Sequence, residues 1–231
     1  MRRITFSQSI LPAYKTTTHA TYALWQAHPS VGDAVAYPDD MRKLCISSGR
    51  TFAATGALAE LHKELMSLAA NDATLDIVPM TSLHFSFLAM SWGLFNEPSE
   101  APPLQDIAAL FAAHTTHIPF VISQLRVVPL RNSLILAGLP DVRSFDARQA
   151  LAKALLQSTW RAHIEARYAG YEIPPLFWHT TLARANTQFA PNTLRELYHA
   201  YRSRTFDDLE LSAPQLALVN YNWSRRFIIS S

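Results

Sequence analysis

Glycine is scarce in this chain, with only six among 231 residues, and no two of the six lie close together. A Walker loop and a dinucleotide-binding fingerprint both need clustered glycines, because backbone N–H groups must come close to a phosphate. The sequence therefore excludes a P-loop NTPase and a Rossmann dehydrogenase. It also lacks Gly-x-Ser-x-Gly, the nucleophile-elbow motif of the α/β hydrolases.

Cysteine, excess charge and long apolar runs are also missing. The single cysteine, Cys45, permits neither an intrachain disulfide nor a cysteine zinc cluster, and its apolar neighbours predict a buried strand residue rather than a nucleophile. Twenty basic and eighteen acidic residues give a net charge of +2 without a basic block, so duplex DNA is not an expected partner. The chain has neither eighteen consecutive apolar residues nor an apolar signal segment. We expect a cytoplasmic protein that does not enter a membrane.

The composition is that of a folded protein, because 49% of the residues are apolar and 16% are charged. Residues 1–43 have no strong periodicity and contain three prolines, so we expect an irregular N-terminal arm. Residues 44–231 are long enough to bury a core of their own. We expect them to form one two-lobed domain, with lobes of about 44–140 and 141–231.

The two halves of that domain show the same order of elements. In the first half, apolar spacing predicts a helix, a strand, a helix and a hairpin, at 55–70, 81–90, 104–113 and 120–138, after a short strand at 44–47. The second half repeats this order at 146–168, 177–183, 191–201 and 215–229. The repeat predicts an α+β fold of two pseudo-symmetric lobes, in which antiparallel sheets face a central cleft and helices lie outside.

One histidine stands in each of the two equivalent strands, and a hydroxyl residue follows two positions later. These pairs are His84 with Ser86 and His179 with Thr181. Residues i and i+2 of a strand face the same side, so each histidine shares a face with its hydroxyl. The sequence holds five His-x-Ser/Thr tripeptides where chance predicts about 1.4, so only the matched strand context singles out these two.

Two histidines and two hydroxyls suit the cleavage of a phosphodiester. One group must take a proton from the nucleophile and another must give a proton to the leaving oxygen, and two imidazoles can hold opposite protonation states near neutral pH. A hydroxyl can donate a hydrogen bond to the phosphate oxygens that gain charge in the transition state. The alternative is that both histidines are core residues hydrogen-bonded to their neighbours.

The two His-x-Ser/Thr strands, about 95 residues apart and each followed by a helix and a hairpin, resemble those of the two-histidine (2H) phosphoesterase superfamily. The match is closest at His179-Thr-Thr-Leu-Ala-Arg184, which is similar to the LigT-like RNA 2′,3′-cyclic phosphodiesterases. This resemblance implies that His84 and His179 form the acid–base pair, that Ser86 and Thr181 bind phosphate, and that no metal or cofactor is required.

Three further residues are candidates for substrate binding. Phe177 and Tyr171 could stack on a base, and Arg184 could contact phosphate, although simple alternation places Arg184 on the strand face opposite His179. His114 and His117 have the spacing of two metal ligands on one helix face, but no third ligand is evident, so we expect no metal site.

The function expected from these residues is metal-independent hydrolysis of a 2′,3′-cyclic phosphate on an RNA end or a nucleotide, by a monomer. Two other activities of the same superfamily stay open, 3′–5′ RNA exonuclease action and hydrolysis of cyclic oligonucleotides. A non-catalytic module that binds a nucleotide or an RNA end is a further alternative.

Overall fold

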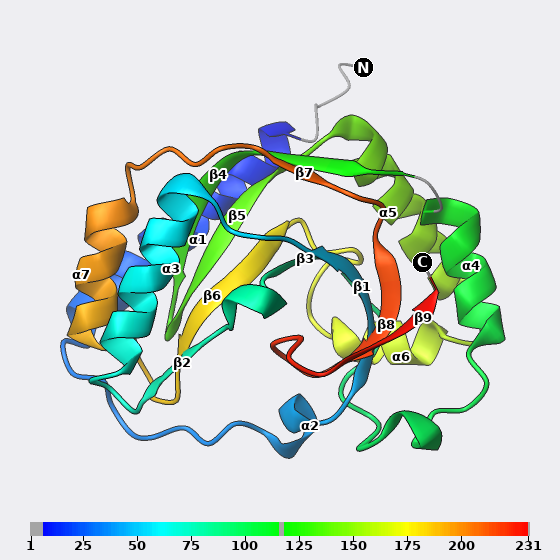
Figure 1. Cartoon of the computed structure of the whole chain (residues 1–231), viewed down its shortest axis with the longest axis horizontal. Coiled ribbons are helices and arrows are strands. Elements are labelled where there is room, and N and C mark those ends of the chain that lie inside the picture. Colours follow the sequence, from blue (N-terminus) through cyan, green and yellow to red (C-terminus); the bar gives the residue numbers. More distant parts are fainter. Residues whose placement is uncertain (1–6, 116–117, 231) are drawn as a thin grey trace.

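The computed structural model describes residues 7–115 and 118–230 and contains two antiparallel sheets (Figure 1). The four-stranded sheet has the order β3-β1-β8-β9 and consists of His84–Ala89, Cys45–Thr51, Gln215–Val219 and Arg226–Ser230. The five-stranded sheet has the order β2-β6-β5-β4-β7 and consists of Leu75–Ile77, His179–Ala185, Ser133–Pro140, Phe120–Leu130 and Leu209–Leu211. All strand pairs are antiparallel, which confirms the predicted α+β class.

The helices cover the outer sides of the sheets. Against the five-stranded sheet pack α1, α3 and α7, which span Ser7–Ala27, Gly56–Ala69 and Asn192–Tyr201. Beside the four-stranded sheet lie α4, α5 and α6, which span Gln105–Thr115, Val142–Leu156 and Arg161–Arg167 (Figure 1). The short α2 covers Asp39–Arg42, and single 3₁₀ turns cover Met80–Ser82 and Pro98–Glu100. Within residues 7–115 and 118–230, none of the helices combines the length and the apolar character that a membrane span requires.

The order helix, strand, helix, hairpin occurs twice, as α3-β3-α4-β4/β5 and as α5-β6-α7-β8/β9, with α6 and β7 as additions in the second half. The hairpins, however, are exchanged. The first hairpin pairs through β5 with β6, and the second pairs through β8 with β1. Strand β5 is buried along its whole length, so it needs a neighbour on either side. The expected lobes of 44–140 and 141–231 are therefore wrong as a division of the sheets, because each sheet takes strands from both halves.

The N-terminal region differs from the expected irregular arm. The 21-residue helix α1 packs on β4 and β5, and its buried residues Ile10, Tyr14 and Trp25 belong to the main hydrophobic core. Two buried hydrogen-bonding side chains also fix it, since Thr21 Oγ1 donates to the Pro129 carbonyl and Trp25 Nε1 to that of Arg131. The boundary at residue 43 therefore does not separate an arm from the core. Residues 28–43 lack long regular structure, as expected.

The single helix expected at 146–168 is two helices, α5 and α6. The Ser158 hydroxyl donates to the Leu155 carbonyl and accepts from the Trp160 backbone N–H. These bonds replace helical ones, because a serine can offer the backbone such an alternative. The interruption lets α6 place Arg167 beside the four-stranded sheet, where it lines a cavity between the two sheets.

Candidate active site

Each motif strand carries a one-residue bulge at the same place after its histidine. On β3, Ser86 and Leu88 pair with adjacent residues of β1, so Phe87 is the extra residue. On β6, Thr181 and Ala183 pair with adjacent residues of β5, so Leu182 is the extra residue. A bulge reverses the alternation of faces beyond it.

The consequence is that the fifth residue after each histidine returns to the histidine's face. This residue is Ala89 on β3 and Arg184 on β6, and both line the cavity that contains the histidines. The expectation that Arg184 faces away from His179 is therefore wrong, because it assumed an uninterrupted strand.

The cavity has a volume of about 440 Å³ and lies between the two sheets. Strand β3 contributes His84 and Ser86, and strand β6 contributes His179 and Thr181. The two motif strands also touch directly, since the His84 backbone N–H donates to Thr180 Oγ1 over 3.3 Å. The structure thus gathers all four motif side chains at one cavity.

The imidazole of His84 is held by one hydrogen bond and one ring stack. It is 5% exposed, and its Nδ1 lies 2.9 Å from the Ser82 carbonyl oxygen. A carbonyl only accepts, so Nδ1 carries a proton and Nε2 of the neutral ring is left as an acceptor. The ring stacks on Trp223, with centroids 4.3 Å apart and planes 13° apart. The pKa of His84 is lowered to about 4, mainly by burial and in part by the nearby His179 and Arg226, while the hydrogen bond to the Ser82 carbonyl acts in the opposite direction.

His179 is partly exposed, and its Nδ1 is buried without a hydrogen-bond partner among the described residues. Burial lowers the pKa of this imidazole to about 4 as well, and the charges of Arg148 and Arg184 act in the same direction. Both imidazoles of the ligand-free protein are therefore neutral at pH 7, and a bound anionic phosphate would favour the protonation of one of them.

The strand that carries His179 is positioned from behind by two buried side chains that the sequence did not single out. Arg148, from α5, donates to the carbonyls of Pro175 and Phe177, and its guanidinium lies 4.0 Å from the centre of the Trp178 ring. Tyr14, from α1, accepts the Trp178 N–H at 3.1 Å and donates to the Gly138 carbonyl at 2.8 Å. These bonds fix the backbone immediately before His179.

Arg148 is 2% exposed, and within the described residues it forms no ion pair with a carboxylate. Burial lowers the pKa of its guanidinium to about 9. A buried cation whose hydrogen-bond partners are carbonyls is costly, and here it holds the segment that leads into the site.

Of the three residues predicted to bind substrate, the structure places only one on the cavity wall. Arg184 lines the cavity, whereas neither Phe177 nor Tyr171 does. Phe177 precedes the start of β6 and packs edge-on against Tyr14, with ring centroids 4.8 Å apart. Tyr171 lies in the loop after α6 and is 78% exposed. The Phe177 ring still lies edge-on to the His179 ring, with centroids 6.3 Å apart, so it contacts the histidine without lining the cavity.

The cavity wall includes further residues that the sequence did not predict, among them Arg167 and Trp92. Arg167 ends α6 and places its guanidinium 4.1 Å from the centre of the Trp92 ring. Trp92 is 44% exposed, and its Nε1 donates to the Ala166 carbonyl. Neither residue belongs to a local motif, because they meet only through the packing of α6 beside the end of β3. Together they give the cavity mouth a cation and an aromatic surface.

Cys45 lies on the cavity wall, partly covered by Val219 and Trp223. Burial raises the pKa of its thiol to about 11, so it is not a thiolate at neutral pH. Among the described residues no three His, Cys, Asp or Glu side chains gather as metal ligands would. His117 of the expected His114/His117 pair lies outside the described residues.

Comparison with protein-family models gave no match, and a search of curated proteins gave none. The fold is similar to that of TT0787 of Thermus thermophilus, at 14% identity and a TM-score of 0.48, over 80% of this chain and 95% of that one. It is also similar to that of E. coli LigT in its apo form, at 11% identity and a TM-score of 0.45, over 81% and 94%. A LigT complex with 3′-AMP gives 12% identity and a TM-score of 0.42 over the same shares.

Proposed function

We propose that this protein is a two-histidine phosphodiesterase that opens 2′,3′-cyclic phosphates on RNA ends or nucleotides. The observation that supports the proposal is the convergence of His84, Ser86, His179 and Thr181 on one cavity, with one histidine and one hydroxyl from each sheet. Arg184 adds a positive charge to the same wall. A core histidine with a purely structural role would need no matching partner from the other sheet.

The reaction needs two proton transfers, and the two imidazoles supply both. One neutral imidazole takes a proton from a water whose oxygen attacks phosphorus. The bond between phosphorus and one ribose oxygen breaks, and the protonated imidazole gives its proton to that oxygen. The hydroxyls of Ser86 and Thr181, with Arg184, stabilise the charge that develops on the non-bridging oxygens. The two histidines then hold exchanged protonation states, and one proton transfer through solvent resets them.

The size of the cavity that holds the histidines suits one nucleotide, either free or at the end of an RNA chain. At about 440 Å³ it is within the range of small-molecule sites, and Trp92 offers a surface on which a base can stack. Every group in the proposed mechanism comes from one chain, so we propose that the monomer is active.

The test uses purified protein with excess EDTA, 2′,3′-cyclic nucleotides, and a short RNA that ends in a 2′,3′-cyclic phosphate. The control is the variant His84→Ala/His179→Ala. Ring opening by the wild type alone would support the proposal, and the 2′- or 3′-phosphate product would identify the bond that breaks. Shortening of an RNA with a 3′-hydroxyl end would point instead to exonuclease action. Binding without any product would indicate a nucleotide-binding module.

A further inference from the structure

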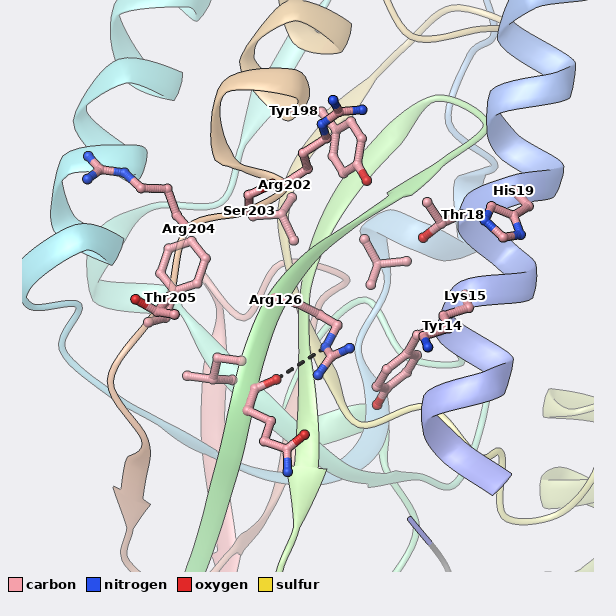
Figure 2. Close-up of a pocket in the computed structure, with 15 residues that line it drawn as sticks. Tyr14, Lys15, Thr18, His19, Arg126, Tyr198, Arg202, Ser203, Arg204 and Thr205 are labelled. Carbon is pink, nitrogen blue, oxygen red and sulfur yellow. Dashed lines mark hydrogen bonds between the residues drawn. The ribbon is translucent and has the colours of Figure 1, made fainter. Parts of the chain in front are cut away.

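A second cavity lies on the outer side of the five-stranded sheet, between α1, β4 and the segment that follows α7 (Figure 2). Its volume is about 450 Å³, and it shares no lining residue with the cavity that holds the histidines. Strand β4 forms its floor and contributes apolar side chains such as Leu125, and Tyr14, Tyr198 and Phe206 contribute further apolar surface.

The charged groups around this cavity are almost all basic. Lys15, Arg126 and Arg202 line it, and none of them forms an ion pair with a carboxylate in the described part of the chain. A fourth cation, Arg204, is neutralised by Glu60 at 3.0 Å. No Asp or Glu lines the cavity, and the nearest contact with one is at its edge, where Asp208 accepts the Gln124 N–H. In a chain of net charge +2, this is a local concentration of free positive charge.

The backbone of β4 is shaped to turn Arg126 toward this side. Between Ser123 and Arg126 the strand gains one residue relative to β5, and Gln124 has a φ of 51°. A bulge re-aims the side chains beyond it, and a positive φ in a residue other than glycine is strained. Arg126 Nε donates to the Gln124 carbonyl at 3.2 Å, which holds the guanidinium over the cavity (Figure 2).

We propose that this outer cavity binds a small organic polyphosphate of about nucleotide size. Three cations from three separate segments line it, although the Arg202 guanidinium also donates to the Tyr22 hydroxyl at 3.4 Å, and the hydroxyls of Thr18, Ser203 and Thr205 supply further donors. An arginine fork and neighbouring hydroxyls are the groups that recognise phosphate oxygens. A single phosphate needs fewer cations, so a ligand with two or more phosphate groups fits best.

Calorimetric titration with ADP and with pyrophosphate at low salt tests the proposal. The variant Lys15→Gln/Arg202→Gln removes two cations from exposed positions, so it is expected to fold normally. The matched control is Arg143→Gln/Lys153→Gln, which removes the same two charge types from exposed positions on α5. We expect the first variant to bind ADP at least tenfold more weakly than the wild type, and the control to differ less than twofold. Arg126→Gln should weaken binding in the same way.

The variant Arg184→Gln distinguishes the two cavities. If Arg184→Gln weakens ADP binding and Lys15→Gln/Arg202→Gln does not, the ligand occupies the histidine cavity and the proposal is overturned. Equal weakening by the α5 control would show a general charge effect and would also overturn it. The proposal would also be overturned if the wild type bound neither ADP nor pyrophosphate at about 1 mM. It would be overturned as well if the wild type bound a short RNA but not ADP, because that result would indicate an extended surface rather than a nucleotide-sized site. Pyrophosphate binding as tight as that of ADP would support recognition of the phosphates alone.

Discussion

The two motif strands, β3 and β6, are alike in their chemistry and different in what holds them. Each presents a histidine, a hydroxyl two positions on and a bulge immediately after it. The His84 ring is contacted directly, by the Ser82 carbonyl of the preceding turn and by the Trp223 ring between β8 and β9. His179 depends on side chains from two distant helices, Tyr14 of α1 and Arg148 of α5, which hold the backbone before it. Similar chemical groups have therefore been placed by unrelated contacts.

The strands also differ at the position that the bulge returns to the cavity, which is alanine on β3 and arginine on β6. Only the second strand brings its own cation to the site. The proposed proton transfers are therefore symmetric between the strands, whereas charge stabilisation is not. Substitutions on either strand can test this difference.

The largest effect is expected from the histidines. His84→Ala and His179→Ala should each lower kcat by at least about 10²–10⁴-fold, because each removes one of two required proton transfers. The double variant should be little worse than either single one, since the pair works as a unit. Steady-state rates on a 2′,3′-cyclic nucleotide measure this, with circular dichroism as the check on folding. Retention of full activity by either variant would remove that histidine from the mechanism.

The pH dependence should show that both imidazoles have low pKa values. A productive pair needs one protonated and one neutral imidazole, and the pKa of each is about 4. As pH rises above both values the singly protonated form is lost, so kcat/KM should fall about tenfold per pH unit between pH 5 and 8. An acid limb should appear near pH 4. A maximum between pH 6.5 and 7 would mean that burial does not shift the imidazoles.

Stability should depend on pH through the same two groups. A histidine whose pKa is lower in the folded state contributes stability that is present above pH 6.5 and is lost as pH falls toward 4, because the unfolded chain binds the proton more readily. The slope is about 1.4 kcal/mol per pH unit for each histidine. Urea denaturation at pH 7 and pH 5 measures it, and His84→Gln should make the dependence shallower. Protein pre-incubated at each pH and assayed at one common pH separates this loss from the catalytic profile.

Arg184 on β6, which has alanine as its counterpart on β3, provides a direct test of the difference in charge stabilisation between the two strands. Arg184→Gln should lower kcat by about 10²-fold, as the loss of a donor to a developing oxyanion does elsewhere. Arg143→Gln, which removes an exposed charge from α5, is the control and should change kcat less than twofold. If Arg184→Gln raised KM alone, the arginine would bind ground state and transition state equally.

Much of this arrangement could be predicted from the sequence, and the failures have physical causes. Strand alternation and the shared order of elements in the two halves identified both motif strands and the repeat. Alternation is a local rule, however, so it could not reveal the bulges that bring Arg184 to the cavity. Helix α1 was missed because Pro12 lies inside it and its buried face includes Thr21, which weakens the apolar pattern. The exchange of hairpins depends on pairing between strands far apart in sequence, such as β1 with β8, and no local pattern records it.

The smallest effect tests the distant support of His179. Tyr14→Phe keeps the ring that packs on Phe177 and removes the hydroxyl that joins Gly138 to Trp178. The Trp178 N–H and the Gly138 carbonyl lose a buried partner, at a cost of about 1–3 kcal/mol. We expect kcat to fall a few-fold while KM and the pH profile stay unchanged, since the imidazole shifts position but keeps its surroundings. Tyr22→Phe, elsewhere on α1, is the control. A loss of stability with unchanged kcat would show that α1 holds the fold together but does not place His179, and the difference between the two strands would then lie in Arg184 and Arg148.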